Sequence, residues 1–220
     1  MRILGIGAHP DDVEIFFFGT LAAAQAAGAE IGWLIATDGS KGGTVPPAKL
    51  RAARRREAAA AGALLAVMPG FLGRVDGELA TDTAAGGLIE AELRRRNPDL
   101  IITHAPNDYH PDHRALSRLI SDAARFRTPV VFADTLMGTG FEPAIWVDVT
   151  AHMGLKHRAI RCHASQRPER FVAATETWNR FRALQANAPD SYAEAFRFEP
   201  VYPFADIRAL LPPAPPAVGL

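Results

Sequence analysis

Four consecutive residues near the start of the chain, His9, Pro10, Asp11 and Asp12, combine groups that can bind a metal ion and move a proton. One imidazole and one carboxylate three positions apart can bind the same ion, which leaves the adjacent Asp11 free to act as a base. Carboxylates are expensive to bury without a partner. The run therefore indicates a reaction centre, although an aspartate at a helix start can also serve as a simple N-cap.

A second run with similar groups lies far along the chain, at residues 108–113. Two of its imidazoles, His110 and His113, are three positions apart and can point to the same side of a turn or helix. A catalytic zinc site uses three protein ligands of the imidazole and carboxylate type and keeps one position for water. His9, Asp12 and His113 can supply these three ligands, so we predict one Zn²⁺ per chain.

The remaining polar groups of the two runs fit a metal-assisted hydrolysis of an amide or related acyl bond. Asp11 is placed to take a proton as general base. His110 can stabilise the oxyanion and then protonate the leaving amine. Asp112 is a natural partner to fix the orientation of an imidazole, and Glu14 either forms an ion pair within its helix or supports the metal ligands.

The elements that must position these residues alternate between apolar runs and helical patterns, which is the signature of a parallel sheet with helices on both faces. We predict a single-domain, Rossmann-like doubly wound α/β fold. Strand order 3-2-1-4-5 would place the two runs across one crevice at the topological switch point. The expected strands are 2–7, 31–37, 70–72, 100–103, 130–136 and 144–149, and the expected helices are 13–27, 48–65, 83–96, one ending near 124, 152–163 and 168–186. The domain is expected to span 1–210, followed by a Pro-rich tail, 211–220, in a polyproline-like or disordered state.

The composition is that of an ordinary globular protein, with 48% hydrophobic and 22% charged residues in 220. Lysine plus arginine equals aspartate plus glutamate at 24 each, which argues against a nucleic-acid partner. The sequence has no apolar run of membrane-spanning length and no cleavable signal pattern. The single Cys162 fits a reducing compartment. We therefore expect a cytoplasmic protein without a membrane partner.

The two runs together resemble the motifs of the zinc-dependent N-acetylglucosaminyl deacetylases, the LmbE-like or PIG-L type. The matching segments are His9-Pro-Asp-Asp with Glu14, Pro106-x-Asp108-x-His110-x-Asp112-His113, Thr37-Asp38-Gly39, Arg54-x-x-Glu57, Asp76-Gly77, His163-x-Ser165-Gln166 and Tyr192-Ala-Glu194-Ala-Phe196. The chain departs from the family where Phe16-Phe17-Phe18 precedes Gly19, because many members carry small residues there.

The resemblance implies an N-deacetylase that acts on an N-acetylated sugar or glucosamine conjugate and releases acetate and a free amine. It implies a homo-oligomer, often a trimer or hexamer. By this resemblance, the family's metal ligands correspond to His9, Asp12 and His113. Its general base corresponds to Asp11, and its oxyanion-stabilising acid to His110. The residues expected to contact the substrate are Arg54, Asp108, His163 and Tyr192.

Other functions remain open at this point. A zinc amidase could act on another amide, such as a thiol S-conjugate or a biosynthetic intermediate. A nucleotide-binding module could use the first turn as a phosphate loop, but Gly5-x-Gly7 lacks the third glycine of the dinucleotide motif. Asp11 and Asp12 would also repel a pyrophosphate. A metal-binding protein without turnover is the third alternative.

Overall fold

The structure is a computed structural model and describes residues 1–200, 203–204 and 206–217. Seven strands form one sheet in the order β3-β2-β1-β4-β5-β7-β6. The first five strands are parallel, and β7 runs antiparallel to both β5 and β6. The strands are β1 (Arg2–Gly7), β2 (Glu30–Thr37), β3 (Gly70–Arg74), β4 (Leu100–His104), β5 (Val130–Ala133), β6 (Ile145–Asp148) and β7 (Ala193–Phe198). The predicted doubly wound α/β fold with a mainly parallel sheet is confirmed.

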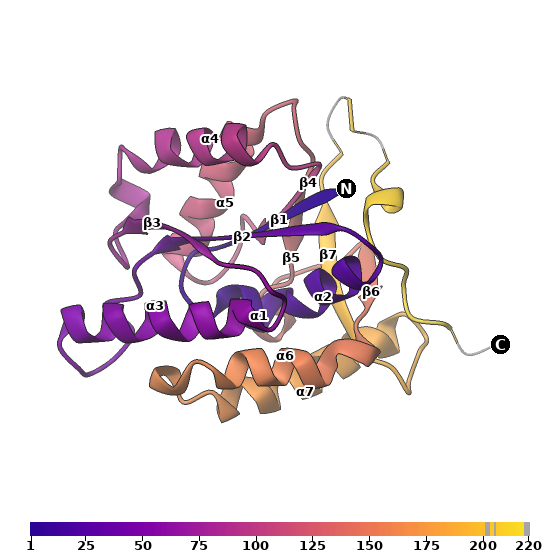
Figure 1. The fold of residues 1–220 in the computed structure, drawn as a ribbon. Helices are drawn as coiled ribbons and strands as arrows, with labels where there is room; N and C mark the ends of the chain where they lie inside the picture. The colour runs from indigo at the N-terminus through magenta and orange to yellow at the C-terminus, as the bar shows by residue number, and fades with distance from the viewer. Residues whose placement is uncertain (201–202, 205, 218–220) are drawn as a thin grey trace.

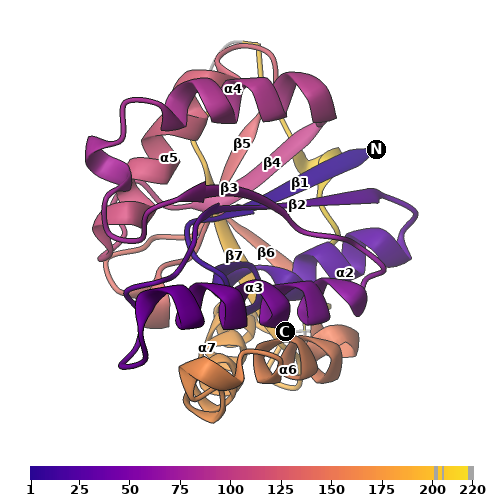
Figure 2. The same cartoon turned by 60° about the vertical axis from the view of Figure 1, so that its left-hand side comes forward.

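Helices cover both faces of this sheet (Figures 1 and 2). Helices α4 and α5 lie on one side, and α1, α2, α3, α6 and α7 lie on the other. Their bounds are α1 (Asp12–Phe16), α2 (Phe18–Ala26), α3 (Pro47–Ala63), α4 (Ala85–Arg96), α5 (Pro111–Ala124), α6 (Met153–Arg161) and α7 (Glu169–Gln185). Short 3₁₀ turns include η1 (Leu79–Thr81), η2 (Leu136–Gly138), η3 (Thr150–His152), η4 (Ala164–Gln166) and η5 (Arg208–Leu210).

The strands are apolar because both faces of the sheet are buried. In β1, Ile3 belongs to the cluster under α1, α2 and α6, whereas Leu4 and Ile6 belong to the cluster under α4 and α5. In β4, Leu100, Ile101 and Ile102 are all fully buried. The centre of the sheet is therefore a rigid support for the turns that follow β1 and β4.

The helix predicted at residues 13–27 is wrong in one respect, because the chain forms two helices there. The backbone of Phe17 takes φ −150° and ψ 17°, which ends α1 at Phe16 and starts α2 at Phe18. The break directs consecutive phenylalanines to different neighbours. Phe17 packs on β1, and Phe18 lies edge-on to Trp33 of β2.

The last third of the chain also differs from the prediction. The strand expected at 130–136 ends at Ala133, and the side chain of the next residue, Asp134, forms a buried ion pair with Arg182. The sequence analysis predicted no strand at β7, which enters the sheet between β5 and β6. Residues 211–217 of the predicted Pro-rich tail form no helix or strand, and the Pro213 carbonyl accepts a hydrogen bond from the Asp148 amide at 2.9 Å. Residues 218–220 of that predicted tail lie outside the described residues.

Candidate metal centre and active site

The turns that follow β1 and β4 meet at one edge of the sheet. Strands β1 and β4 are neighbours and parallel, with Gly5 paired to Ile102, so their carboxyl ends lie side by side. The first turn leads into α1 and the second into α5, with Pro111 in the first turn of α5. A proline fits there because the first amide groups of a helix have no intrahelical partner. The topology thus places the two polar runs at the switch point of the sheet.

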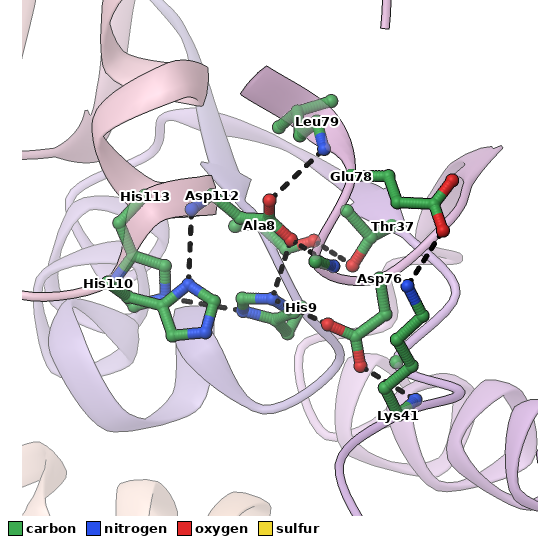
Figure 3. Close-up of polar contacts among 12 residues, drawn as sticks. Ala8, His9, Thr37, Lys41, Asp76, Glu78, Leu79, His110, Asp112 and His113 are labelled. Carbon is green, nitrogen blue, oxygen red and sulfur yellow. Dashed lines mark hydrogen bonds and ion pairs between the residues drawn. The ribbon is translucent and has the colours of Figure 1, made fainter. Parts of the chain in front are cut away.

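Three donor groups converge between these turns. The Nδ1 atom of His9 lies 3.3 Å from Nε2 of His113 and 3.3 Å from Oδ2 of Asp12. Nε2 of His113 lies 3.3 Å from Oδ1 of Asp12. Figure 3 shows the rings of His9 and His113 facing each other. All three side chains are buried, so each group has exchanged water for the others.

Carboxylates hold the opposite edges of both rings. Nε2 of His9 lies 3.2 Å from Asp76 and 3.3 Å from Asp112, as Figure 3 shows. Nδ1 of His113 lies 3.1 Å from Asp108. These carboxylates favour a proton on the ring nitrogens beside them, so the nitrogens that face Asp12 can offer their lone pairs to a cation.

The negative charges around this cluster favour a positive charge at its centre. Burial alone would lower the pKa of His113, but Asp12 and Asp108 outweigh it and raise the pKa to about 9. The pKa of His9 is likewise raised well above its ordinary value by Asp12, Asp112 and Asp76 in spite of burial. Two nitrogen donors and one carboxylate are the ligand types that zinc prefers. The residues present therefore fit a bound cation of this kind.

Two further histidines lie within reach of the same centre. His104 can form a ligand group with Asp12 and His113, and His110 can form one with His9 and His113. His104 is fully buried, and its ring stacks on that of His113 with centroids 3.7 Å apart. Its Nε2 atom already accepts the amide hydrogen of Ala8 at 3.1 Å. His104 therefore supports the ligands, and the sequence analysis did not assign it to the site.

Asp11 lies between the metal-binding groups and an arginine. Its backbone is in the left-handed region, with φ 119°. Nη2 of Arg54 lies 2.8 Å from Oδ1 of Asp11, and Arg54 also donates to the carbonyls of Pro10 and Gly39. Burial raises the pKa of Asp11, and the Arg54 guanidinium opposes the shift. A strained backbone at such a position is typical of a functional site.

His110 lies at the start of α5, on the other side of the cluster. Its Nδ1 accepts the amide hydrogen of Asp112 at 3.2 Å, so its proton resides on Nε2. Its ring is edge-on to that of His9, with centroids 4.6 Å apart. Burial, together with the nearby His9 and His113, lowers the pKa of His110. The ring is therefore a neutral hydrogen-bond donor.

These groups open into a cavity of about 250 Å³, which we call the site cavity. One part of its wall is polar and another part is apolar. The polar part consists of His9, Asp11, Asp12, Arg54, Asp76, His110, His113, Gln166 and Arg170, and the apolar and aromatic part consists of Ile15, Phe16, Leu136, Tyr109 and Phe171.

The expected substrate contacts occupy different places. Arg54 lines the site cavity. Asp108 is 2% exposed and contacts His113, and His163 is 1% exposed and contacts the Glu14 carboxylate. The structure does not place Tyr192 in the cavity wall, because its hydroxyl contacts Glu176 and Arg180 of α7.

Asp112 and Glu14 lie behind the cavity wall. The Asp112 carboxylate accepts the amide hydrogens of Gly77 and Leu79 at 2.6 and 3.1 Å, and it also faces His9. Glu14 pairs with His163 instead of with a cation of its own helix. Both side chains act on neighbouring residues, so neither is a direct contact of a ligand in the cavity.

The sequence analysis missed several cavity residues because they come from separate segments of the chain. Asp76 fixes the loop after β2 by accepting the Lys41 amide hydrogen at 2.9 Å, as Figure 3 shows. Leu136, Arg170 and Phe171 carry no motif. Asp76 and Gln166 stood in segments with a recognisable pattern, Asp76-Gly77 and His163-x-Ser165-Gln166, but neither was assigned to the site.

Residues 4–124 match a protein-family model described as PIG-L, GlcNAc-PI de-N-acetylase. A diacetylchitobiose deacetylase from Thermococcus kodakarensis is 29% identical over 234 residues, which cover 94% of this chain and 88% of that protein. The solved structure of N,N′-diacetylchitobiose deacetylase from Pyrococcus horikoshii matches with a TM-score of 0.78 and 27% identity, covering 93% of this chain and 87% of that one.

A 4-carboxy-2-hydroxymuconate hydratase from Pseudomonas putida has the same fold. Its structure matches with a TM-score of 0.80 and 22% identity over 91% of this chain and 97% of that one. At this identity the likeness concerns the fold alone, so the fold does not decide between hydrolysis and hydration.

Proposed function

We propose a function for this chain, which belongs to the PIG-L family of GlcNAc-PI de-N-acetylases. It is an amide hydrolase and removes the N-acetyl group from an N-acetylglucosamine-type sugar. The observation that carries this proposal is the convergence of His9, Asp12 and His113 beside Asp11 and His110. Two relatives that are named diacetylchitobiose deacetylases support the substrate class.

His9, Asp12 and His113 would hold one Zn²⁺ per chain. When bound, such an ion polarises a carbonyl oxygen and lowers the pKa of water towards neutrality. The chain supplies the groups that keep these ligands in place. Asp108 and Asp112 fix the imidazole rings, and the backbone amide of His9 donates to Asp12 at 2.6 Å.

Asp11 acts as the general base in this proposal. It lines the site cavity next to Asp12, and Arg54 holds its carboxylate in one orientation. A carboxylate that is oriented by a guanidinium but not bound to the metal can accept a proton from the attacking water. It passes that proton to the leaving amine nitrogen when the amide breaks into acetate and amine.

His110 acts opposite Asp11. The neutral ring keeps its Nε2 proton, because Nδ1 is occupied by the amide hydrogen of Asp112. This proton is available to the oxygen that becomes negative when the acetyl carbonyl is attacked. Because the ring is neutral, the proton for the leaving amine is the one that Asp11 took from water, and His110 keeps its own.

The polar part of the cavity wall suits the sugar. Arg54, Asp76 and Gln166 line it, and together they offer both donors and acceptors to hydroxyl groups. Asp108 and His163 are buried, so in this proposal they position His113 and Glu14 and do not contact the sugar.

The test is an acetate-release assay with N,N′-diacetylchitobiose and N-acetylglucosamine conjugates, using protein whose zinc content has been measured. We expect release of one acetate for each amine formed, and loss of release after chelation. Larger acyl amides and a 4-carboxymuconate-type diene acid serve as alternative substrates. Hydrolysis of those amides alone, or hydration of the diene acid alone, would contradict the deacetylase function.

We further propose that the protein is a cytoplasmic homo-oligomer, a trimer or hexamer. Large apolar side chains on the surface support this, with Phe126 at 71% and Phe181 at 50% exposure. Among the described residues, no helix is long and apolar enough to cross a bilayer. Light scattering of the purified protein measures the assembly, and a monomeric mass would contradict it.

A further inference from the structure

Phe16 forms part of the cavity wall directly beside the proposed metal ligands. Its ring is edge-on to that of His113, with centroids 5.8 Å apart, and edge-on to that of His104 at 5.3 Å. The side chain lines the site cavity although only 3% of it is exposed. The ring therefore closes the cavity at its metal end.

The break between α1 and α2 gives Phe16 this direction. Because the helix is interrupted at Phe17, the next two rings turn into the core. Phe17 lies so close to β1 that a Cβ atom on Gly5 would be 2.9 Å from its Cε2. Phe18 packs on Trp33 at 6.0 Å. Of the three phenylalanines, Phe16 is the one in the cavity wall.

A fixed tryptophan supports Phe16 from behind. The ring of Trp178 is edge-on to Phe16 at 5.8 Å and is itself 3% exposed. Its Nε1–H donates to Asp134 at 2.8 Å, and Arg182 binds both oxygens of the same carboxylate at 2.5 and 2.9 Å. A ring packed against a side chain held in this way has little room to move aside.

The position of Phe16 suits the acyl part of the substrate. Hydrolysis requires the acyl carbonyl to lie at His113 and His110, and the acyl chain starts one bond from that carbonyl carbon. Sugar hydroxyls need hydrogen-bond partners, which Arg54 and Asp76 offer. A hydrocarbon chain needs none, so the apolar surface of Phe16 beside His113 fits the chain better than the sugar.

We propose that Phe16, supported by Trp178, limits the acyl group that this enzyme removes to acetyl. The inference rests on the proposed deacetylase function. It narrows the substrate class to amino sugars that carry an N-acetyl group and excludes those with a longer N-acyl chain. A chain longer than acetyl would have to enter the space that the ring fills, and packed walls resist extra methylene groups.

The test compares kcat/KM for N-acetyl, N-butyryl and N-hexanoyl glucosamine conjugates. For the unmodified protein we expect the hexanoyl substrate to be at least about a hundredfold poorer than the acetyl substrate. In Phe16→Ala the hexanoyl-to-acetyl ratio should rise by at least about tenfold, because each buried methylene contributes about fourfold. Zinc content should not change.

Phe18→Leu is the matched control, because Phe18 is in the same segment but packs on Trp33 away from the cavity. It should leave the hexanoyl-to-acetyl ratio unchanged. Phe16→Leu replaces Phe16→Ala if the alanine variant fails to fold. Calorimetric binding of acetate, butyrate and hexanoate gives a second readout that needs no turnover, and Phe16 variants should gain affinity for hexanoate.

Three outcomes would overturn the inference. In the first, the unmodified protein removes hexanoyl as readily as acetyl. In the second, Phe16→Ala slows all three substrates equally and gains no affinity for hexanoate. In the third, the variant changes the preference for the sugar but not for the acyl chain. If no acyl sugar is hydrolysed by zinc-loaded protein, the deacetylase function itself fails, and this inference fails with it.

Discussion

Two of the places where the molecule buries charged side chains are built differently. Below α2, Glu194 accepts the amide hydrogens of Gly19 and Thr20 at 2.9 and 2.7 Å and pairs with Lys156 at 2.6 Å. Lys156 also donates to Asn179 at 3.1 Å. The carboxylate therefore has donors on both oxygens, and its charge is neutralised by a side chain of the same protein.

At the carboxyl edge of β1 and β4 the buried carboxylates are not neutralised in this way. His9, Asp12 and His113 converge on one point, and Arg54 pairs with Asp11 and not with Asp12. Carboxylates behind the rings add further negative charge. The comparison teaches that buried charge with its own counterion stabilises the fold, whereas converging lone pairs indicate a site for a cation from outside.

The largest expected effect is that of His113→Ala, which removes one of three converging donors. We expect the variant to lose stoichiometric zinc and its deacetylase activity to fall by at least about ten-thousandfold. Elemental analysis and acetate release measure the two losses. Full zinc content in this variant would contradict the difference between the two clusters, since His9, Asp12 and His113 would then not be the site of the cation.

Asp11→Asn tests whether the Asp11 carboxylate has a different role from that of Asp12. We expect zinc to remain at one per chain while turnover falls by about a thousandfold, because the base is lost but the ligands are not. The measurements are zinc content and kcat. Retained turnover would exclude Asp11 as the base.

Lys156→Met tests the other cluster, which should affect stability and not chemistry. Burial lowers the pKa of Lys156 and Glu194 opposes the shift. Removing the lysine leaves a buried carboxylate without its cation, which should cost about 3–5 kcal/mol in the free energy of unfolding. Denaturant unfolding measures the loss, and kcat of the folded fraction should not change.

The double variant Lys156→Met, Glu194→Gln sharpens this result. It removes both charges, so it should be more stable than Lys156→Met alone. A double variant that is less stable than either single variant would show that the pair does not act as one unit.

The smallest expected effect is that of Asp108→Asn, which weakens the support of His113 without removing a ligand. We expect zinc affinity to fall by about 10- to 100-fold. Competition with a metal indicator measures it. An affinity equal to that of the unmodified protein would mean that the contact of Asp108 with Nδ1 does not orient the ring.

The sequence predicts the centre of the fold well because its signals there are local. The apolar runs of β1 and β4 and the polar groups that follow them lie in adjacent positions, and the doubly wound topology then brings the two turns together. The polar groups of both turns, His9, Asp12 and His113, can therefore be assigned to one site from the sequence.

The remaining features depend on contacts between distant segments. β7 contains Glu194 at a fully buried position, and a buried charge is not typical of a strand. Its burial is explained by the ion pair with Lys156, which is distant in the sequence. The helix break at Phe17 follows from packing on Gly5 and Trp33 in the sheet. Cavity residues such as Leu136 and Phe171 come from η2 and from the first turn of α7, and no local pattern indicates that either one faces the site.

The position of β7 has a consequence for the order in which the protein assembles. The proposed ligands all lie within the first 113 residues, in the turn and helices that follow β1 and β4, and these two strands pair with each other. Glu194 must instead close a loop of 175 positions to reach Gly19. Contacts of such long range form slowly, so we expect the metal-binding half to take shape first during synthesis and the Trp178 support of Phe16 to follow.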